Sequence, residues 1–516
     1  MSPRRRNGGA RVSAVLLMAV HLAGCTAWQT QRATPAAVLA EQPSRVRLML
    51  NNGARVVLAS PVLRNDSVVG TPTHMSRGAP VTAIPVSDIE AMAVSRVSAG
   101  RTIALVAGIG ATALLVMAAS EDEMFDGGGG GGGGGETPTN FSCPLVYSWD
   151  GDEWRLDSGT FGGAIARAFA RADIDNLVFA RPIRGRLRLR LANELQETDY
   201  VNQLVVLAVD HDSGMSVAPG PDGSIHLLRS PVGAVSAHDF GGRDVLARVA
   251  ASDEVHWETR LAPVDTTGVP ADGIELAFAR PVGSSAHLVL DARNTAWSTW
   301  LMGRFVAAHG QGTQAWYDSL DAHPEFARSV REGLAKAAFL RASVLVNGAW
   351  VPQGILWEAG PEIAKRQVLE LDLSAVRDSV VRIRLDAPPA FWSIDFVGLE
   401  AAIDDRVLAL HTLEAATAVD RHGRDVRGLL AAVDTAEYVL ETGDAADLEF
   451  VVPPDPAAGA RTYLLRTHGW YRIQSPETGK PQVALLRTVL DGRGGLARAA
   501  ALRFNAALLA AGRRPR

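Results

Sequence analysis

Carboxylates at alternate positions are the residues of this chain whose types and spacing first suggest a chemical site. Asp173 and Asp175 lie in "RADIDNLV", and Asp210 and Asp212 flank a histidine. Carboxylate oxygens suit calcium, and a carboxylate beside an imidazole suits zinc or manganese. The first segment lacks the glycine and the distal glutamate of an EF-hand. These four residues are therefore candidate metal ligands. The favoured interpretation is that they lie in exposed, solvated turns.

Two tryptophans are candidates for ligand binding. Trp350 follows the predicted Asn347-Gly348 turn, and Trp357 lies in a predicted loop. Exposed aromatic faces serve as stacking surfaces for sugar rings in carbohydrate-binding sandwiches. Trp297 and Trp300 recur at helical spacing, which favours packing in a core instead.

Motifs that name an enzyme class do not occur in this sequence. It contains no H-E-x-x-H, C-x-x-C, G-x-S-x-G or P-loop pattern. The surroundings of Cys143 are apolar, which favours a buried thiol over a reactive one. We predict no catalytic residue and no cofactor. The favoured function is non-catalytic binding or scaffolding, and the alternative is a carbohydrate-active hydrolase whose carboxylates are brought together by folding.

The beginning of the chain has the layout of an export signal. Four arginines precede an apolar stretch over 12–22, and Leu22-Ala23-Gly24-Cys25 follows. This tetrapeptide resembles the lipobox of bacterial lipoproteins. The resemblance implies that residues 1–24 are a signal peptide and that Cys25 becomes the lipid-bearing first residue. With Thr26 next, it also implies an outer-membrane address rather than an inner-membrane one. The alternative is an ordinary signal peptide, or an uncleaved anchor in which the cysteine occurs by chance.

The balance of charge limits the partners. The formal net charge is −5, and removal of the four leader arginines makes it −5 − 4 = −9. An acidic chain without a basic stripe is not expected to bind nucleic acid as its main partner. We expect the membrane as a partner through Cys25, and a glycan or an envelope protein as a further partner.

A second apolar segment covers 102–119, close to the minimum length of a membrane span. Small residues recur every fourth position before and within it, which permits close helix packing and self-association. These residues are Gly100, Ala104, Gly108 and Thr112. Export through Cys25 makes a simple crossing difficult, because the charges that flank 102–119 oppose the positive-inside tendency. A helix packed on the membrane or on its own copies, a true span and a buried helix remain open.

The rest of the sequence predicts a mainly β protein with helical insertions. Asn52-Gly53 separates two alternating segments, and alternation returns in "GRLRLRLANE" and "DSVVRIRLDAPP". The expected N-terminal segments are a tether over 25–43, a small SH3/Sm-like barrel over 44–98, an apolar helix over 99–120 and a glycine-rich linker over 121–140. After the linker we expect an antiparallel β-sandwich over 141–293, a helical insertion over 294–340 and a jelly-roll-like sandwich over 341–400. A further β region over 401–480 and a helical tail over 481–516 follow.

The segment after the linker opens with Ser-Cys-Pro-x-x-Tyr-x-x-Asp-Gly at 142–151. It resembles a block in uncharacterised bacterial envelope lipoproteins. The resemblance implies an envelope location and a β-rich C-terminal region, and it implies no activity. The segment over 341–400 also resembles galactose-binding-like jelly rolls in its strand rhythm and in the run Phe391-Trp392-x-Ile394-Asp395, without a ligand motif.

Overall fold

The computed structural model describes residues 26–31, 39, 43, 45–50, 55–72, 82–97, 143–258, 271–357, 359–403, 407, 409–456, 459–475, 478–490 and 495–512. The chain divides into two compact units. The first is Met1–Ala111 with Asp253–Val255, and the second, larger unit is Thr112–Ser252 with His256–Arg516. Cys25, the small-residue seam Gly100, Ala104, Gly108 and Thr112, the apolar helix over 99–120 and the glycine-rich linker lie outside the described residues.

The first unit is a six-stranded antiparallel sheet. Its strands are β1 (Thr26–Gln31), β2 (Arg45–Leu50), β3 (Arg55–Arg64), β4 (Ser67–Pro72), β5 (Thr82–Pro85) and β6 (Ile89–Val97). The predicted hairpin across Asn52-Gly53 is confirmed by the pairing of β2 with β3. The order is β1-β6-β2-β3-β4-β5, so the described strands β1 and β5 are opposite, unpaired edges. The small SH3/Sm-like barrel predicted over 44–98 is thus an open sheet in its described part, and β1 belongs to the segment predicted as a tether.

No described helix is long and apolar enough to cross a membrane.

The second unit contains two antiparallel β-sandwiches, which confirms the predicted fold class. Sandwich I has the sheets β25-β27-β10-β7-β8 and β24-β11-β28-β9, and β26 pairs with β11. Its strands are β7 (Leu145–Trp149), β8 (Trp154–Gly159), β9 (Arg171–Asn176), β10 (Arg186–Ala192), β11 (Glu197–His211), β24 (Ala409–Leu413), β25 (Ala415–Asp420), β26 (Tyr438–Leu440), β27 (Ala445–Val451) and β28 (Ala460–Ile473).

Sandwich II has the sheets β15-β17-β22-β19-β20 and β14-β23-β18-β21, and β16 pairs with β23. Its strands are β14 (Val232–Gly233), β15 (Ser236–Asp239), β16 (Trp257–Glu258), β17 (Asp272–Ala279), β18 (Ser285–Asn294), β19 (Leu340–Val346), β20 (Ala349–Leu356), β21 (Lys365–Asp372), β22 (Val380–Ala387) and β23 (Trp392–Ala401). A hairpin of β12 (Ser216–Pro219) and β13 (Ile225–Leu228) precedes it.

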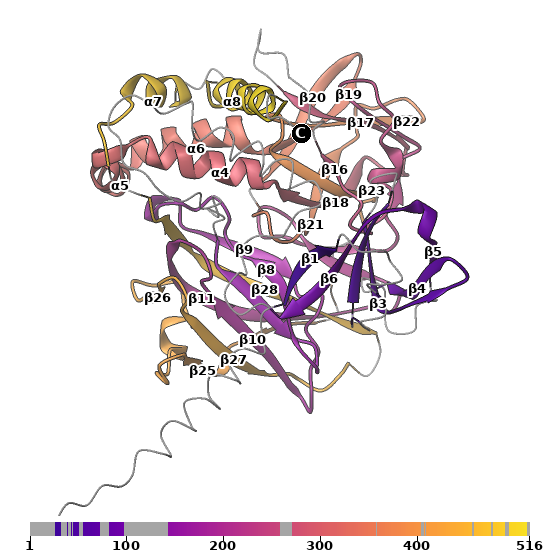
Figure 1. Cartoon of the computed structure of the whole chain (residues 1–516), viewed down its shortest axis with the longest axis horizontal. Coiled ribbons are helices and arrows are strands. Elements are labelled where there is room, and N and C mark those ends of the chain that lie inside the picture. Colours follow the sequence, from indigo (N-terminus) through magenta and orange to yellow (C-terminus); the bar gives the residue numbers. More distant parts are fainter. Residues whose placement is uncertain are drawn as a thin grey trace, which may run out of the picture. The chain divides into compact units, whose positions relative to one another are not determined.

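The domain boundaries differ from the predicted ones. The strands of sandwich II follow one another from 232 to 401, whereas sandwich I combines 145–211 with 409–473. The sandwich predicted over 141–293 is thus divided between two sandwiches, and the further β region over 401–480 completes sandwich I (Figure 1). Alternation along a strand shows which side chains face a core, but it does not show which distant strand is the neighbour.

The two sandwiches have the same internal plan. The sheet β25-β27-β10-β7-β8 of sandwich I corresponds strand by strand to β15-β17-β22-β19-β20 of sandwich II. In the same way β24-β11-β28-β9 corresponds to β14-β23-β18-β21, and the additional strand β26 corresponds to β16. The counterparts share the sequence Asp-x-x-Gly-Arg-Asp-Val, at 239–245 and 420–426, followed by the 3-10 turns η3 (Leu246–Arg248) and η5 (Arg427–Leu429). The second unit therefore carries one sandwich design twice, and sandwich II is inserted between the two halves of sandwich I.

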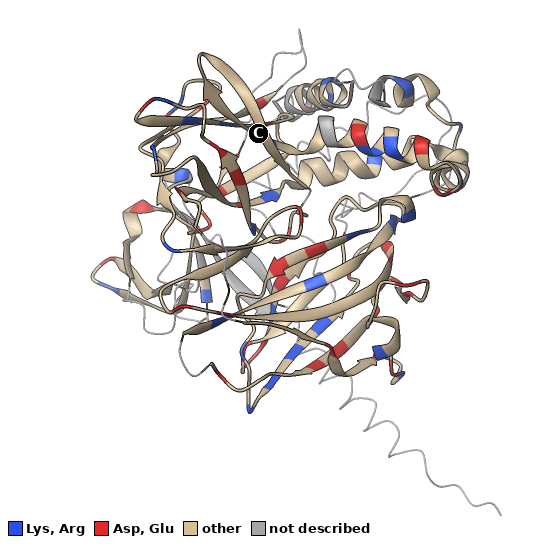
Figure 2. Cartoon of the chain, turned by 180° about the vertical axis from the view of Figure 1, so that it is seen from behind, with Lys and Arg blue, Asp and Glu red and all other residues tan. Residues whose placement is uncertain are grey.

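The same outward ion pair occurs on both copies. Arg190 bonds Asp447 at 2.6 Å, and Arg384 bonds Glu275 at 2.5 Å, each between the second and third strands of its sheet. Leucine, isoleucine and valine alternate with these arginines and are buried, as predicted. Figure 2 shows basic and acidic residues on neighbouring strands of the sheets. Exposed pairs of this kind contribute little to stability, so their repetition is informative mainly about the duplication.

Five α-helices complete the described part of this unit. They are α4 (Ala296–Ala307), α5 (Thr313–Ala322) and α6 (Pro324–Ala338) between β18 and β19, and α7 (Val483–Leu490) and α8 (Gly495–Gly512) at the C-terminus. Thr295 caps α4 by accepting a hydrogen bond from the Ser298 backbone N–H. Trp297 stacks on Trp300 at 5.0 Å and meets Phe504 of α8 at 5.5 Å. The predicted core role of these two tryptophans is confirmed, and the helices lie together (Figure 1).

Candidate functional site

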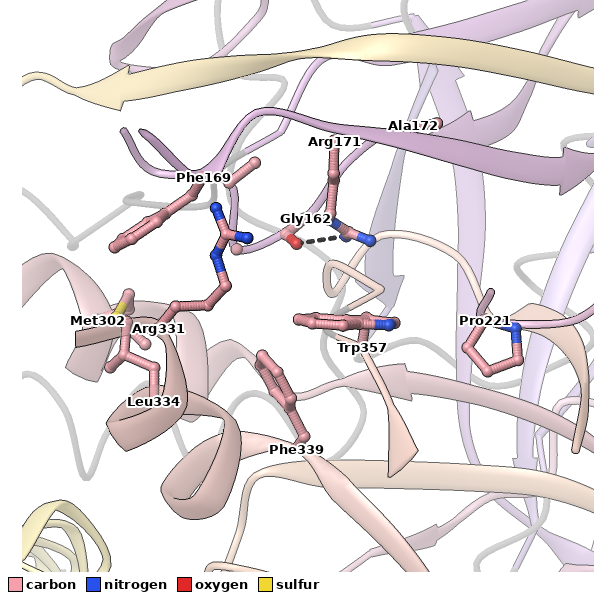
Figure 3. Close-up of a pocket in the computed structure, with 12 residues that line it drawn as sticks. Gly162, Phe169, Arg171, Ala172, Pro221, Met302, Arg331, Leu334, Phe339 and Trp357 are labelled. Atoms are coloured by element: carbon pink, nitrogen blue, oxygen red, sulfur yellow. Dashed lines mark hydrogen bonds between the residues drawn. The ribbon is translucent and has the colours of Figure 1, made fainter. Parts of the chain in front are cut away.

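A cavity of about 180 Å³ lies between sandwich I, the helices α4 and α6, and the ends of the β19–β20 hairpin of sandwich II (Figure 3). Strands β9 and β20 lead to it from the two sandwiches, and α4 and α6 cover it from the helical side. Its walls are Gly162, Gly163, Ala164, Phe169, Arg171, Ala172, Pro221, Met302, Arg331, Leu334, Phe339 and Trp357.

Aromatic side chains form the floor of this cavity. Trp357 directly follows β20, and Phe339 connects α6 to β19, so the ends of two elements bring them together. Their ring centroids are 4.8 Å apart with the planes tilted by 58°. Phe169 lies in the 3-10 turn η2 (Arg167–Phe169) and is buried. The predicted ligand-binding candidate Trp357 is therefore at a cavity, although the other two rings were not predicted.

Two guanidinium groups face the same cavity. Arg171, the first residue of β9, donates from Nη2 to the Gly162 carbonyl at 2.6 Å and lies over Trp357 at 5.6 Å from its centroid. Arg331 of α6 lies over Phe169 at 5.4 Å and donates to the Ala168 carbonyl. The loss of surrounding water, and then the nearby charge of Arg171, lower the pKa of Arg331. The lining residues include no carboxylate, so the walls offer donors and positive charge.

A buried ion cluster lies next to this wall. The Nζ of Lys365, the first residue of β21, is 2.7 Å from Asp173 Oδ2 and 2.8 Å from Asp175 Oδ1. Ser158 donates to Asp175, and Arg171 Nη1 is 3.9 Å from Asp173 Oδ1. The two aspartates alternate on β9 and so share one face of the strand. The cluster therefore joins sandwich I to sandwich II and adjoins the cavity through Arg171.

The two aspartates of this cluster have different acidities. Burial raises the pKa of Asp173, but Lys365 and Arg171 outweigh that effect and leave it below its ordinary value. For Asp175 burial dominates over Lys365, and its pKa rises to about 6. Burial alone would lower the pKa of Lys365, whereas its two carboxylate partners raise it. At neutral pH the cluster thus holds one ammonium between two carboxylates.

The proposed metal ligands are placed differently from the expected turns. Asp173 and Asp175 are buried in a strand, where Lys365 supplies the positive charge that a metal would supply. Asp210, also buried, accepts two hydrogen bonds from Arg461, at 2.5 and 2.9 Å, and Arg461 lowers its pKa. Asp212 is exposed, as expected of a turn. Among the described residues no three His, Cys, Asp or Glu side chains gather in a way that could hold a metal ion.

Trp350 lies on the outer face of sandwich II, away from the cavity walls. The Arg384 guanidinium covers its ring at 4.2 Å from the centroid. The counterpart in sandwich I is Trp154, which Arg190 covers at 4.6 Å. Both rings are partly exposed. Because the same arginine-over-tryptophan contact occurs on both copies, it belongs to the shared sheet design, and the structure does not bring Trp350 and Trp357 into one site.

A second buried group surrounds the unpaired cysteine. Cys143 is fully buried, as predicted, and its backbone N–H donates to Glu197 Oε1 at 2.9 Å. Burial raises the pKa of the Cys143 thiol and of the Glu197, Asp199 and Glu362 carboxyls, and nearby acids raise the pKa of Cys143 and Glu197 further. A thiol in such surroundings stays protonated and is a poor nucleophile. None of these four side chains lines the cavity.

The sequence contained few signals for the residues that the cavity combines. Arg171, Arg331 and Phe339 belong to three distant segments and to no motif. Lys365 stands out by its residue type. The chain has only three lysines, at 336, 365 and 480, among many arginines. Lysine presents a compact charge with three donors, unlike the planar guanidinium of arginine, and here that charge lies between two carboxylates.

Comparisons with known proteins leave the family open. No family model and no curated protein matches this chain. A GH31 alpha-xylosidase from Xanthomonas citri aligns at 10% identity and a TM-score of 0.15, covering 80% of this chain and 38% of that chain. A triple jelly-roll protein from the turret assembly of an archaeal virus aligns at 8% identity and a TM-score of 0.14, covering 59% of this chain and 90% of that chain. At such TM-scores neither likeness supports an argument.

Proposed function

We propose that this chain is a lipid-anchored cell-envelope protein with a non-catalytic binding role, and that the cavity beside Trp357 is its ligand site. The observation that carries the proposal is the composition of the cavity walls. They combine Phe169, Phe339 and Trp357 with Arg171 and Arg331. Mostly apolar cavities with a few fixed polar groups are the usual form of small-ligand sites.

The positions of the carboxylates favour binding over sugar hydrolysis. A glycosidase places two carboxyl groups on opposite sides of the bond it cleaves, roughly 5 to 9.5 Å apart and open to substrate. Asp173 and Asp175 adjoin the cavity, but both are buried and both bond Lys365. In addition, Arg171 and Phe339 lie against Trp357, so its ring serves as a wall more readily than as an open platform for a sugar.

The envelope location rests on the leader sequence. The basic and apolar stretches and Leu22-Ala23-Gly24-Cys25 support export and lipidation, in the order that lipoprotein signals require. More than one acyl chain is needed for stable anchoring, and a lipidated N-terminal cysteine supplies them. Such an anchor would hold the binding unit at the membrane surface.

A cavity-blocking variant tests the binding role. Pro221 lines the cavity beside Trp357 and is half-buried in the turn between β12 and β13, so Pro221→Trp places a large ring in the cavity without disturbing a core (Figure 3). Pro281→Trp is the matched control, because Pro281 is also a half-buried loop proline and lies outside the cavity. We expect a mixed library of one-ring compounds, screened by ligand-observed NMR, to give signals that Pro221→Trp removes and Pro281→Trp retains. A library without any signal, or with signals that Pro221→Trp retains, would contradict the proposed site.

A further inference from the structure

We infer that the cavity selects a ligand with one apolar or aromatic ring and a single carboxylate. This inference rests on the proposed binding role and names the ligand class of the same site. Three features of the cavity lead to it: its volume, the charges around it and the placement of its donors.

The volume of about 180 Å³ limits the part of a ligand that enters. An engineered apolar cavity of about 150 Å³ holds benzene. The space here therefore accommodates one ring with a short polar substituent, and it is too small for a chain of sugars. Met302, Leu334 and Phe339 are buried and offer the apolar surface that such a ring requires.

The charges around the cavity leave one positive charge without a balancing acid. Arg171 and Lys365 contact the carboxylates of Asp173 and Asp175. Arg331, by contrast, is exposed and forms no ion pair with any residue that the structure describes. A single carboxylate on the ligand would pair with the Arg331 charge, whereas a cation would add to it.

The guanidinium of Arg331 also has the right geometry for a carboxylate. A guanidinium presents several N–H donors in one plane and can hold both oxygens of a carboxylate. Arg331 uses one of its nitrogens for the Ala168 carbonyl, and its pKa is lowered by the loss of water and by Arg171. Figure 3 shows the Arg331 side chain rising between Phe169 and the Trp357–Phe339 pair. A carboxylate bound there would have a ring directed toward the aromatic floor.

Three one-ring probes that differ in charge test this ligand class. The full-length protein in detergent is titrated with phenylacetate, with the neutral phenylacetamide and with the cationic benzylammonium. We expect phenylacetate to bind about tenfold or more tightly than phenylacetamide, because a hydrogen bond to a charged partner is the stronger kind. Benzylammonium is expected to show no binding. Arg331→Gln should remove the preference for phenylacetate and reduce its affinity to that of phenylacetamide.

The control is Arg328→Gln, on the same helix. Arg328 is exposed, bonds Glu325 at 2.8 Å and does not line the cavity. This variant should retain the affinity for phenylacetate, and thermal unfolding should show that both variants are folded. Equal binding of the three probes, or an Arg331→Gln variant that retains the preference, would overturn the inference and leave the binding site intact. If none of the three probes binds while other compounds give signals that Pro221→Trp removes, the ligand class is wrong but the site stands. The absence of any signal from probes and library together would reject both.

Discussion

Lys365 Nζ donates a hydrogen bond of 2.7 Å to Asp173 Oδ2 and so connects the edge strands of two copies of one sandwich. Lys365 begins β21 opposite Ala292, and Arg171 begins β9 opposite Gly469. Ala292 and Gly469 are matching residues of the central strands β18 and β28. Lys365 and Arg171 are thus counterparts, and both contact Asp173. The two sandwiches therefore differ at this matching position, where one has a lysine and the other an arginine, and this is the place where the sandwiches meet.

Removal of the buried ammonium should be costly. Lys365→Met leaves Asp173 and Asp175 buried without their cation, and we expect the free energy of unfolding to fall by about 3–5 kcal/mol. Denaturant unfolding followed by tryptophan fluorescence measures the change. Lys480→Met is the control, because Lys480 is exposed, and it should have little effect. Equal stability of the two variants would mean that the cluster contributes nothing.

The buried Glu362 should make stability depend on pH. Burial raises its pKa from an ordinary 4.5 to about 8. The folded protein then keeps a proton that the unfolded chain has released, so its stability falls as pH rises from about 4.5 to about 8. We expect Glu362→Gln to reduce this fall, measured as the free energy of unfolding at several pH values. Glu414→Gln, at an exposed position, should leave the fall as it is.

Asp157 and Asp175 contribute a change of the same sign over a lower range. The pKa of each rises from 3.8 to about 6, chiefly because of burial, so this part of the decrease occurs between about pH 4 and 6 in every variant. Glu197 and Asp199, whose pKa values burial also raises, add a decrease of the same sign in every variant. A decrease in the unfolding free energy of Glu362→Gln between pH 6 and 8 that equals that of the unmodified protein would contradict the assignment to Glu362.

The repeated turn should have equal importance in both copies. Asp239 accepts from the backbone N–H and the Nε of Arg243 at 2.9 and 2.6 Å, and Asp420 accepts from Arg424 at the same two distances. We expect Asp239→Ala and Asp420→Ala to lower the midpoint of thermal unfolding by similar amounts. Asp212→Ala, at an exposed turn, should leave it unchanged. A large decrease for one copy alone would show that the two turns are not equivalent in energy.

The lipid anchor can be tested by fractionation. Cys25→Ala should move the protein from the membrane to the soluble fraction, because it removes the sulfur that carries the lipid. Cys143→Ala is the matched control, and it should remain with the membrane, since Cys143 is buried in the second unit. If Cys25→Ala stays in the membrane, lipidation is not the anchor, and the apolar segment over 102–119 becomes the candidate.

Local sequence patterns predicted the elements well where the physical cause is local. Leu187, Leu189 and Leu191 alternate with arginines and are all buried, as the period of a strand requires. Asn347 and Gly348 have φ values of 50° and 81° between β19 and β20, the left-handed conformation that favours these two residue types. The open first sheet was not predicted, because closure depends on whether edge strands meet.

The sequence contains traces of the duplication, but these traces do not show which segments pair to form each sandwich. Arg-Leu-Arg-Leu at 188–191 matches Arg-Ile-Arg-Leu at 382–385, and the turn at 239–245 matches that at 420–426. A comparison of the chain with itself would have found these pairs. It would not have shown that 145–211 pairs with 409–473, since each half has strands compatible with either partner and the choice depends on packing between distant segments.

For the site, the sequence established residue types and alternation. Asp173 and Asp175, two residues apart, share one face wherever the chain is extended, although exposed turns were the favoured prediction. Trp357 was predicted to lie in a loop. Their surroundings came from tertiary structure. Lys365, 192 residues from Asp173, turns an apparent metal site into a buried ion cluster. Arg171, Arg331 and Phe339 meet only because two sandwiches and a helix converge, and a cavity formed by packing leaves no pattern along the chain.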